Sequence, residues 1–294
     1  MYLPEVEFHE SASLEEASSL LSKFGADARL LAGGTELLVD LKTGRRSARH
    51  LVSLNSISGL RGITLTGSGL RVGALTTLAE LDRHGDVRRL FPALHDATSK
   101  MAAVQIRNMA TVGGNVVCAV PCADLPPVLG VLNASVTAWS PRGERTIPIE
   151  SFFVGVRRTV LKDDEILASV VVPAPGPGFG AAYARFSLRD GNAVAVAAVA
   201  AALRMGSDGA IADARMALGA VSPTPKLVQS AQKLLVGRRP EDRVFAEASD
   251  AAVRESEPIS DVRGSAQFRR EIVGVLARRA LCAATERARG TGHG

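Results

Sequence analysis

The segment LLAGGTELL, residues 30–38, places two adjacent glycines and a threonine in the middle of an apolar run. A buried strand or helix normally has side chains to pack at such positions. Glycine permits positive φ and close approach of a ligand to the backbone, so successive N–H groups can converge on phosphate oxygens. A tight turn between packed elements is the commoner use of a glycine pair, and this segment alone does not exclude it.

A second glycine pair lies in MATVGGNVV, residues 109–117, again beside a threonine. Two such turns in one domain, each with a threonine hydroxyl as a further donor, favour a clamp around a pyrophosphate. Neither segment has the G-x-G-x-x-G spacing of a dinucleotide-binding βαβ unit, and the sequence contains no P-loop. The pattern therefore indicates a phosphate site outside these two motif classes.

The flanking sequence predicts short alternating elements. Ser13 and Glu16 form a capping-box pattern at the start of SLEEASSLLSKFG, and Gly25 stands where a C-terminal helix cap belongs. ARLLAGGT is typical of a short buried strand that runs into the glycine turn, and ELLVDLKTG continues as a short helix. Farther on, a hairpin turns at residues 67–69 and a helix begins at about Thr77.

A cluster of prolines and glycines, VPAPGPGFGAAY at residues 172–183, marks the best domain boundary. After it, AVAVAAVAAALRM and IADARMALGAV flank the turn GSDGA and predict an antiparallel strand pair, although alanine itself favours helices. Helical stretches are expected near residues 226–235, 241–256 and 266–289.

Composition limits the possible functions. With 294 residues, 46% of them hydrophobic, the chain can bury a sizeable core. A net charge of +5 and only 4% aromatic residues favour an anionic ligand over a nucleic acid. The start of the sequence has no signal-peptide pattern, and no apolar run is long enough for a transmembrane segment, which predicts a cytoplasmic location.

Cysteines and histidines are few. The three cysteines cannot form a disulfide framework or supply four thiolates to an iron–sulfur cluster. The five histidines, His9, His50, His84, His95 and His293, show no paired metal-ligand spacing, so no metal site is expected. Any redox chemistry in this chain would therefore need an organic cofactor.

Four segments together resemble the FAD-binding medium subunit of the xanthine dehydrogenase and carbon monoxide dehydrogenase family of molybdenum hydroxylases: LLAGGTELL, QIRNMATVGGNVVCAVPCADLPPVLGVLNA, DEILASVVVP and SPTPKLVQSAQKLL. The resemblance covers nearly the whole chain in the same order. It implies an α+β fold whose two-lobed FAD-binding domain, of the p-cresol methylhydroxylase type, occupies residues 1–175, in lobes of about 1–57 and 58–175. A smaller α+β domain of the carbon monoxide dehydrogenase flavoprotein type, with an antiparallel sheet and helices, follows at 176–289. Residues 290–294 are expected to be a disordered tail.

The resemblance also implies which residues hold FAD, the one cofactor expected. LLAGGTE would hold the ADP half and the pyrophosphate, and TVGGN would form the second loop. The acid of ADLPP would contact the adenosine side, and the strand in DEILAS would pack near the isoalloxazine. An arginine of YARFSLR falls where many relatives have a flavin-contacting lysine. The implied residues are Leu30, Leu31, Ala32, Gly33, Gly34, Thr35, Glu36, Thr111, Gly113, Gly114, Asn115, Asp124, Ile166, Leu167 and Arg185.

Several of these residues have a purely structural alternative. Asp124 could cap the helix that begins at LPP, and Ile166 and Leu167 could be ordinary core residues. Arg185 could be a surface charge whose stem lies along a strand, and its donor geometry differs from that of lysine. Ala168 stands where relatives often carry a larger aliphatic residue, which leaves open what shields the flavin ring.

The cysteine pattern and the absence of other redox domains indicate the type of subunit. Cys118 and Cys122 lie in CAVPCADLPP without the cysteine-bearing insertion of the 4-hydroxybenzoyl-CoA reductase branch, so they are expected to be small packing residues. The resemblance implies a separate electron-transfer subunit that passes electrons from a partner's [2Fe-2S] cluster to an external acceptor. Its partners would be a [2Fe-2S] small subunit and a molybdopterin large subunit, in a dimer of heterotrimers. The alternatives are a self-sufficient FAD-dependent reductase or oxidase, and a scaffold without flavin, against which the intact glycine pairs argue.

Overall fold

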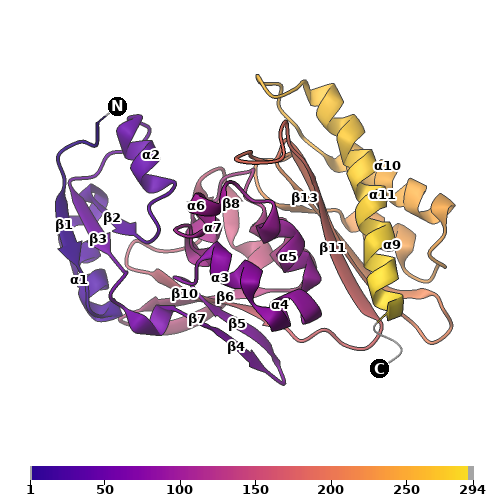
Figure 1. Ribbon diagram of the computed structural model, residues 1–294, viewed down its shortest axis with the longest axis horizontal. Coiled ribbons are helices and arrows are strands. Elements are labelled where there is room, and N and C mark those ends of the chain that lie inside the picture. The colour runs from indigo at the N-terminus through magenta and orange to yellow at the C-terminus, as the bar shows by residue number, and fades with distance from the viewer. Residues whose placement is uncertain (1, 291–294) are drawn as a thin grey trace.

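The computed structural model describes residues 2–290, in which sheets of three, five and four strands and a two-stranded ribbon are combined with helices (Figure 1). The strands are β1 (Glu7–Glu10), β2 (Ala28–Leu31), β3 (His50–Ser53), β4 (Ile63–Thr66), β5 (Gly69–Gly73), β6 (Ser135–Ser140), β7 (Gly143–Pro148), β8 (Phe153–Gly155), β9 (Arg158–Thr159), β10 (Ile166–Pro173), β11 (Phe179–Phe186), β12 (Ala197–Met205), β13 (Ile211–Gly219) and β14 (Lys226–Leu227). The α-helices are α1 (Leu14–Phe24), α2 (Leu37–Lys42), α3 (Leu78–Arg83), α4 (Gly85–Leu90), α5 (Pro92–Ser99), α6 (Val104–Arg107), α7 (Val112–Val117), α8 (Leu125–Val131), α9 (Gln229–Leu235), α10 (Asp242–Glu255) and α11 (Ala266–Gly290).

The first lobe is the parallel sheet β1-β3-β2 with α1 packed against it, at the left of Figure 1. Helix α1 begins as the sequence predicts. The Ser13 hydroxyl accepts a hydrogen bond from the Glu16 amide at 3.1 Å, and the Glu16 carboxylate accepts one from the Ala12 amide at 2.8 Å. Gly25 ends the helix with a φ of 51°, which glycine adopts without strain. Strand β2 then leads into the first glycine loop at the carboxyl edge of the sheet.

The second lobe is built on the antiparallel sheet β4-β5-β10-β6-β7. The predicted hairpin joins β4 to β5, and the predicted helix α3 begins after Thr77. The Thr77 hydroxyl accepts from the Glu80 amide, while the Glu80 carboxylate accepts from the Thr77 amide. The apolar sides of α3, α5 and α8 pack against this sheet. Together they form one core, which includes Phe91 and Leu129.

The C-terminal part is the antiparallel sheet β11-β12-β13-β14 with α9, α10 and α11 packed beside it, at the right of Figure 1. The alanine-rich segment forms strand β12, as predicted, because both of its faces are buried. Ala198, Ala200 and Ala202 face the core shared with the second lobe. Val199 and Leu203 face the core made with α10 and α11. Tertiary packing therefore overrides the helix propensity of alanine.

Helix α11 lies directly on strand β11. A Cβ atom at Gly180 would come within 2.1 Å of the Ala284 carbonyl oxygen, so only glycine permits this approach. Near the end of the helix, Arg287 Nη1 donates to Asp96 on α5 at 2.6 Å and to the Ala181 carbonyl oxygen at 2.7 Å. These contacts join the C-terminal helix to the second lobe.

Some details differ from the sequence-based expectation. The stretch 226–235 is not one helix, because strand β14 pairs with β13 before α9 begins. Gly113 and Gly114 lie inside α7 rather than in a turn, since Thr111 caps that helix ahead of them. The predicted tail at 290–294 lies outside the described residues except for Gly290, which ends α11. No helix within residues 2–290 is long and apolar enough to cross a membrane.

Candidate functional site

The first glycine loop joins β2 to α2 and has free backbone donors. Only Gly34 of the glycine pair has positive φ, at 72°. Within residues 2–290, the amides of Gly33, Gly34 and Thr35 have no protein acceptor. Consecutive free N–H groups beside a left-handed residue form a nest that attracts an anion. The loop therefore has the geometry of a phosphate-binding turn.

The residues that precede this loop are apolar but not fully buried. Leu30, Leu31 and Ala32 are all only half-buried, although they continue a strand of the sheet. The Ala32 carbonyl oxygen accepts a hydrogen bond from Asn55 Nδ2 at 3.3 Å, which fixes the start of the loop. The strand and loop thus present apolar surface next to free amides, a combination that suits a ligand with both apolar and anionic parts.

The two glycine loops touch at Gly33. A Cβ atom there would lie 1.9 Å from the Met109 carbonyl oxygen and 3.1 Å from Ala110 Cα, immediately before the second loop. Gly33 is required so that the two backbones can pack against each other, and Gly34 is required for its positive φ. Both glycines also keep free amides, so the prediction that they contact a ligand stays open.

The second loop is a capped helix terminus. The Thr111 hydroxyl accepts from the Gly114 amide at 3.0 Å, and the Gly113 amide donates to the Ala74 carbonyl oxygen at 2.8 Å. These amides are therefore already bonded within the protein. The side-chain oxygen of Asn115 is buried and has no hydrogen-bond partner among the described residues. It is an acceptor without a protein donor, in the helix that Thr111 caps.

Glu36 lies in an ion-pair cluster. Arg157, on the turn between β8 and β9, donates from Nη2 to Glu36 Oε1 at 2.7 Å and from Nη1 to Asp40 Oδ2 at 2.6 Å. Asp40 is nearly inaccessible, with 1% of its side chain exposed, whereas the Glu36 side chain is 45% exposed. Arg157 thereby holds α2, and the first glycine loop that precedes it, against the second lobe.

Asp124 and Arg185 form a buried pair with Tyr183. The Tyr183 hydroxyl donates to Asp124 Oδ1 at 2.6 Å, and Arg185 Nη1 donates to the two carboxylate oxygens at 3.1 and 3.0 Å. The side chains of Asp124 and Arg185 are only 4% and 5% exposed, so Arg185 is not the surface charge that one sequence interpretation allowed. Asp124 occupies the N-cap position of α8, but its side chain bonds no helix amide there. The capping alternative is therefore wrong.

Burial controls the protonation of this cluster. It raises the pKa of Asp124, while Arg185 and the Tyr183 hydroxyl act in the opposite direction. Burial and the neighbouring carboxylate together raise the pKa of Tyr183 well above its ordinary value. The proton therefore stays on the Tyr183 hydroxyl, which remains a donor to Asp124.

The three residues of the DEILAS strand point into the interior from β10. Ile166 and Ala168 belong to the core beneath α1, and Leu167 belongs to the core of the second lobe. All three are at most 4% exposed. The Ala168 carbonyl oxygen accepts from the Ala74 amide at 2.9 Å, and so supports the segment that receives Gly113. Contact of Ile166 or Leu167 with the flavin ring stays a prediction.

The two neighbouring thiols have the environment of packing residues. Burial raises the pKa of Cys118 to about 11 and also raises that of Cys122. Cys118 Sγ lies 3.2 Å from the Asn115 carbonyl oxygen, to which it donates. Both thiols are therefore protonated at neutral pH and are poor nucleophiles or metal ligands.

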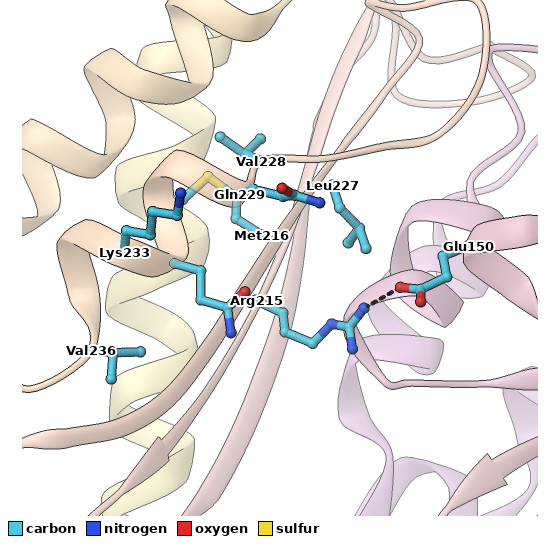
Figure 2. Close-up of a pocket in the computed structure, with 9 residues that line it drawn as sticks. Glu150, Arg215, Met216, Leu227, Val228, Gln229, Lys233 and Val236 are labelled. Atoms are coloured by element: carbon cyan, nitrogen blue, oxygen red, sulfur yellow. Dashed lines mark hydrogen bonds and ion pairs between the residues drawn. The ribbon is translucent and has the colours of Figure 1, made fainter.

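A separate cavity of about 630 Å³ lies away from the glycine loops (Figure 2). Its lining includes Arg215 on β13, Glu150 beside the second-lobe sheet, and Gln229 and Lys233 on α9. The Arg215 guanidinium donates to Glu150 at 2.8 Å across it. None of the predicted cofactor residues lines this cavity, so we place the functional site at the glycine loops, where the free amides lie.

The comparisons with known proteins identify the family. The family described as the FAD binding domain in molybdopterin dehydrogenase matches residues 4–175, and the CO dehydrogenase flavoprotein C-terminal domain matches residues 181–284. The chain belongs to the molybdopterin dehydrogenase flavoproteins. Its cofactor is FAD, and it is an oxidoreductase subunit.

Individual relatives match this flavoprotein over nearly its whole length. The carbon monoxide dehydrogenase medium chain of Hydrogenophaga pseudoflava is 34% identical, over 98% of this chain and 99% of its own. The xanthine dehydrogenase FAD-binding subunit of Escherichia coli O157:H7 is 32% identical, over 96% and 97%. Among solved structures, carbon monoxide dehydrogenase from Hydrogenophaga pseudoflava superposes with a TM-score of 0.94, at 34% identity, over 98% of this chain and 99% of that chain. Quinoline 2-oxidoreductase from Pseudomonas putida 86 superposes with 0.91, at 29% identity, over all of both chains.

The residues present at the two loops fit FAD. The nest at Gly33–Thr35 suits the pyrophosphate, the half-buried Leu30 and Leu31 offer apolar contact, and the orphaned oxygen of Asn115 suits a hydroxyl or amine donor. The individual contacts of the residues named from the sequence stay predictions.

Sequence reasoning missed four residues that organise this site. Arg157 and Asp40 are brought together only by the fold. Tyr183 had a usable signal, since it lies two residues before Arg185 on a strand and must therefore face the same side. Asn55, which fixes the Ala32 carbonyl oxygen, gave no local signal.

Proposed function

We propose that this chain is the electron-transfer subunit of a molybdenum hydroxylase: it carries FAD, accepts electrons from a [2Fe-2S] cluster on a partner subunit and passes them to an external acceptor. The family membership supports the flavin part of this proposal, and the names of the relatives, which are a medium chain and an FAD-binding subunit, support its place in a larger complex. When bound, FAD supplies the capacity to exchange electrons.

The observation that carries the proposal is the state of the polar groups beside the loops. Arg157 neutralises Glu36 and Asp40, Arg185 neutralises Asp124, and burial keeps the Cys118 thiol protonated. Groups held in this way are poorly placed to act as a general base or a nucleophile. Binding and orienting the cofactor is the role that suits them, which favours electron transfer over a self-sufficient reductase or oxidase.

The chain's own residues would position the cofactor in three ways. The amides of Gly33–Thr35 bind the pyrophosphate, and the guanidinium of Arg157 keeps their loop in place through Glu36 and Asp40. The Asp124–Arg185 pair keeps the adjoining wall of the second lobe rigid. Half-buried apolar residues of β2 exclude water from the cofactor's apolar face.

We further propose a [2Fe-2S] small subunit and a molybdopterin large subunit as partners, in a dimer of heterotrimers. Apolar side chains stand exposed beside the second loop, including Val104 at 52%, Ile106 at 38% and Met109 at 61%. Such a patch is expected where another subunit packs. The three cysteines are free, which supports a reducing compartment such as the cytoplasm. Recovery of the native protein in a periplasmic fraction would contradict that location.

Native co-purification tests this assignment. A tagged chain should bring down two further polypeptides together with iron and molybdenum, and the complex should show the mass of six chains. The isolated chain should bind FAD, and the FAD-loaded chain should oxidise NAD(P)H very slowly. A chain that runs alone and oxidises NAD(P)H at about 1 s⁻¹ or faster would instead establish the self-sufficient flavoenzyme.

A further inference from the structure

Three side chains with metal-ligand chemistry meet on the first sheet, away from the glycine loops. Strands β1 and β3 are parallel and in register, with Glu7 opposite His50. His9 lies two residues after Glu7, so its side chain points to the same face of the sheet. The spacing of these histidines in the sequence gave no sign of a pair, because 41 residues separate them.

The ligand atoms of these three side chains all lie within 4.8 Å of one another. His9 Nε2 lies 3.1 Å from His50 Nδ1 and 3.7 Å from Glu7 Oε1. His50 Nδ1 lies 3.4 Å from Glu7 Oε2. Tetrahedral zinc with bonds of about 2.0–2.1 Å requires ligand atoms about 3.4 Å apart. The three separations lie within a few tenths of an ångström of that value. The two distances to Glu7 end on different carboxylate oxygens, so the exposed Glu7 side chain must rotate to bring one oxygen to a cation.

The two imidazoles are held in place by packing. The His50 ring stacks on Phe24 at the end of α1, with ring centroids 3.7 Å apart and an interplanar angle of 14°. The His9 ring also stacks on Phe24, at 5.1 Å. Both histidine side chains are 17% exposed, whereas Glu7 is 64% exposed. The rings are thus preorganised, and the carboxylate side of the cluster is open to water.

We propose that Glu7, His9 and His50 bind one Zn²⁺ or a chemically similar divalent transition metal, with water as the fourth ligand. Two imidazoles and one carboxylate form a ligand set suited to such ions rather than to Mg²⁺ or Ca²⁺, which prefer oxygen ligands. Without metal, one neutral imidazole donates its N–H to the other. To bind the metal, the donor ring takes the tautomer whose proton is on its other nitrogen, so that both rings offer a lone pair.

The expected role is to tie the first strand to the sheet. The cluster lies at the amino ends of the parallel strands, level with Ala28 of β2, whereas the glycine loop leaves β2 after Leu31. Metal binding should therefore stabilise the first lobe without contact with the FAD loop. The inference is independent of the proposed electron-transfer function.

Zinc titration of the full chain tests the site. The wild-type protein should bind one zinc per chain in competition with a fluorescent chelator, and its melting temperature should rise with zinc concentration. His9→Gln and His50→Gln should each lose affinity by about tenfold or more, the equivalent of about 1.4 kcal/mol. Glu7→Gln should fold normally, because this side chain is exposed, and it should bind zinc more weakly than the wild type. Magnesium should not shift the melting temperature.

A matched control addresses binding to thiols. Cys282 is an exposed cysteine on α11, and Cys282→Ser should leave zinc affinity unchanged. The proposal is overturned if the wild-type chain binds no zinc, if the Glu7 and histidine variants bind it as tightly as the wild type, or if the Cys282 variant alone loses it. Melting temperatures measured without metal show that each variant is folded.

Discussion

Replacement of Asp124 by alanine should destabilise the protein strongly, because it leaves a buried cation without its counter-charge. The Arg185 side chain is 5% exposed, and after the change its Nη2 would keep only the bond to the Ala193 carbonyl oxygen at 3.1 Å. Removal of one partner from a buried ion pair costs about 3–5 kcal/mol. We expect a loss of this size in the free energy of unfolding.

Two companion variants separate charge from packing. Tyr183→Phe removes one hydrogen bond to a charged acceptor and should cost about 1.5–3 kcal/mol. Asp124→Asn combined with Arg185→Gln removes both charges and leaves no group uncompensated. This double variant should therefore be more stable than Asp124→Ala alone, although it differs from the wild type at two buried positions.

Urea unfolding of apo and FAD-loaded protein, followed by circular dichroism and by the fluorescence of Trp139, measures these effects. Trp139 is the single tryptophan and lies on β6 within the first domain. A loss of about 0.5 kcal/mol or less for Asp124→Ala, the range of an ordinary surface change, would refute the argument from burial. A double variant as unstable as Asp124→Ala would also refute it. A parallel FAD titration shows whether Asp124 contributes to affinity beyond its effect on folding.

Three further outcomes are expected. Gly33→Ala should lower both stability and FAD content, because its Cβ meets backbone at 1.9 Å, whereas Gly114→Ala, 3.0 Å from a hydroxyl, should remain folded; equal melting temperatures would contradict this. The hydrogen bond from Arg145 lowers the pKa of Glu165 from its ordinary 4.5. The wild type should therefore be more stable than Glu165→Gln above about pH 4.5, and urea unfolding at several pH values should show this advantage disappear as the pH falls further. Iodoacetamide should modify exposed Cys282 well before Cys118, whose thiol has a pKa of about 11, and mass spectrometry of the peptides would reveal the reverse order.

Local signals in the sequence predicted much of this fold. The helix that starts after Ser13 follows capping chemistry within four residues, a pattern that is visible directly in the sequence. The helix predicted from about Thr77 also begins with a capping box, between Thr77 and Glu80. The alanine-rich β12 was predictable from its turn and its neighbour strand. The prediction of a turn at the second glycine pair is wrong, because Thr111 caps a helix that contains both glycines.

The site was predictable only where its residues are adjacent in sequence. The free amides at Gly33–Thr35 could be predicted because they belong to one loop. The bond from Arg157 to Glu36 spans 121 residues and depends on the hairpin of β8 and β9, in which Arg157 has a φ of 59°. The meeting of His9 and His50 depends on the parallel pairing of two strands. No local rule specifies such contacts, because they are fixed by the packing of whole elements.

The bond between Asp96 and Arg287 has a consequence for the order in which the chain assembles. The two residues are 191 positions apart, and Arg287 lies in the last turns of α11. The ribosome releases Asp96 long before Arg287 exists, so until then this carboxylate lacks its arginine and has only the Tyr183 amide to bond. When α11 packs on β11, Arg287 also bonds the Ala181 carbonyl oxygen. Strand β11 then lies between α11 and the second lobe. The first domain is thus a template on which the end of the chain docks, and a nascent chain halted before Arg287 should keep that surface open to chaperones.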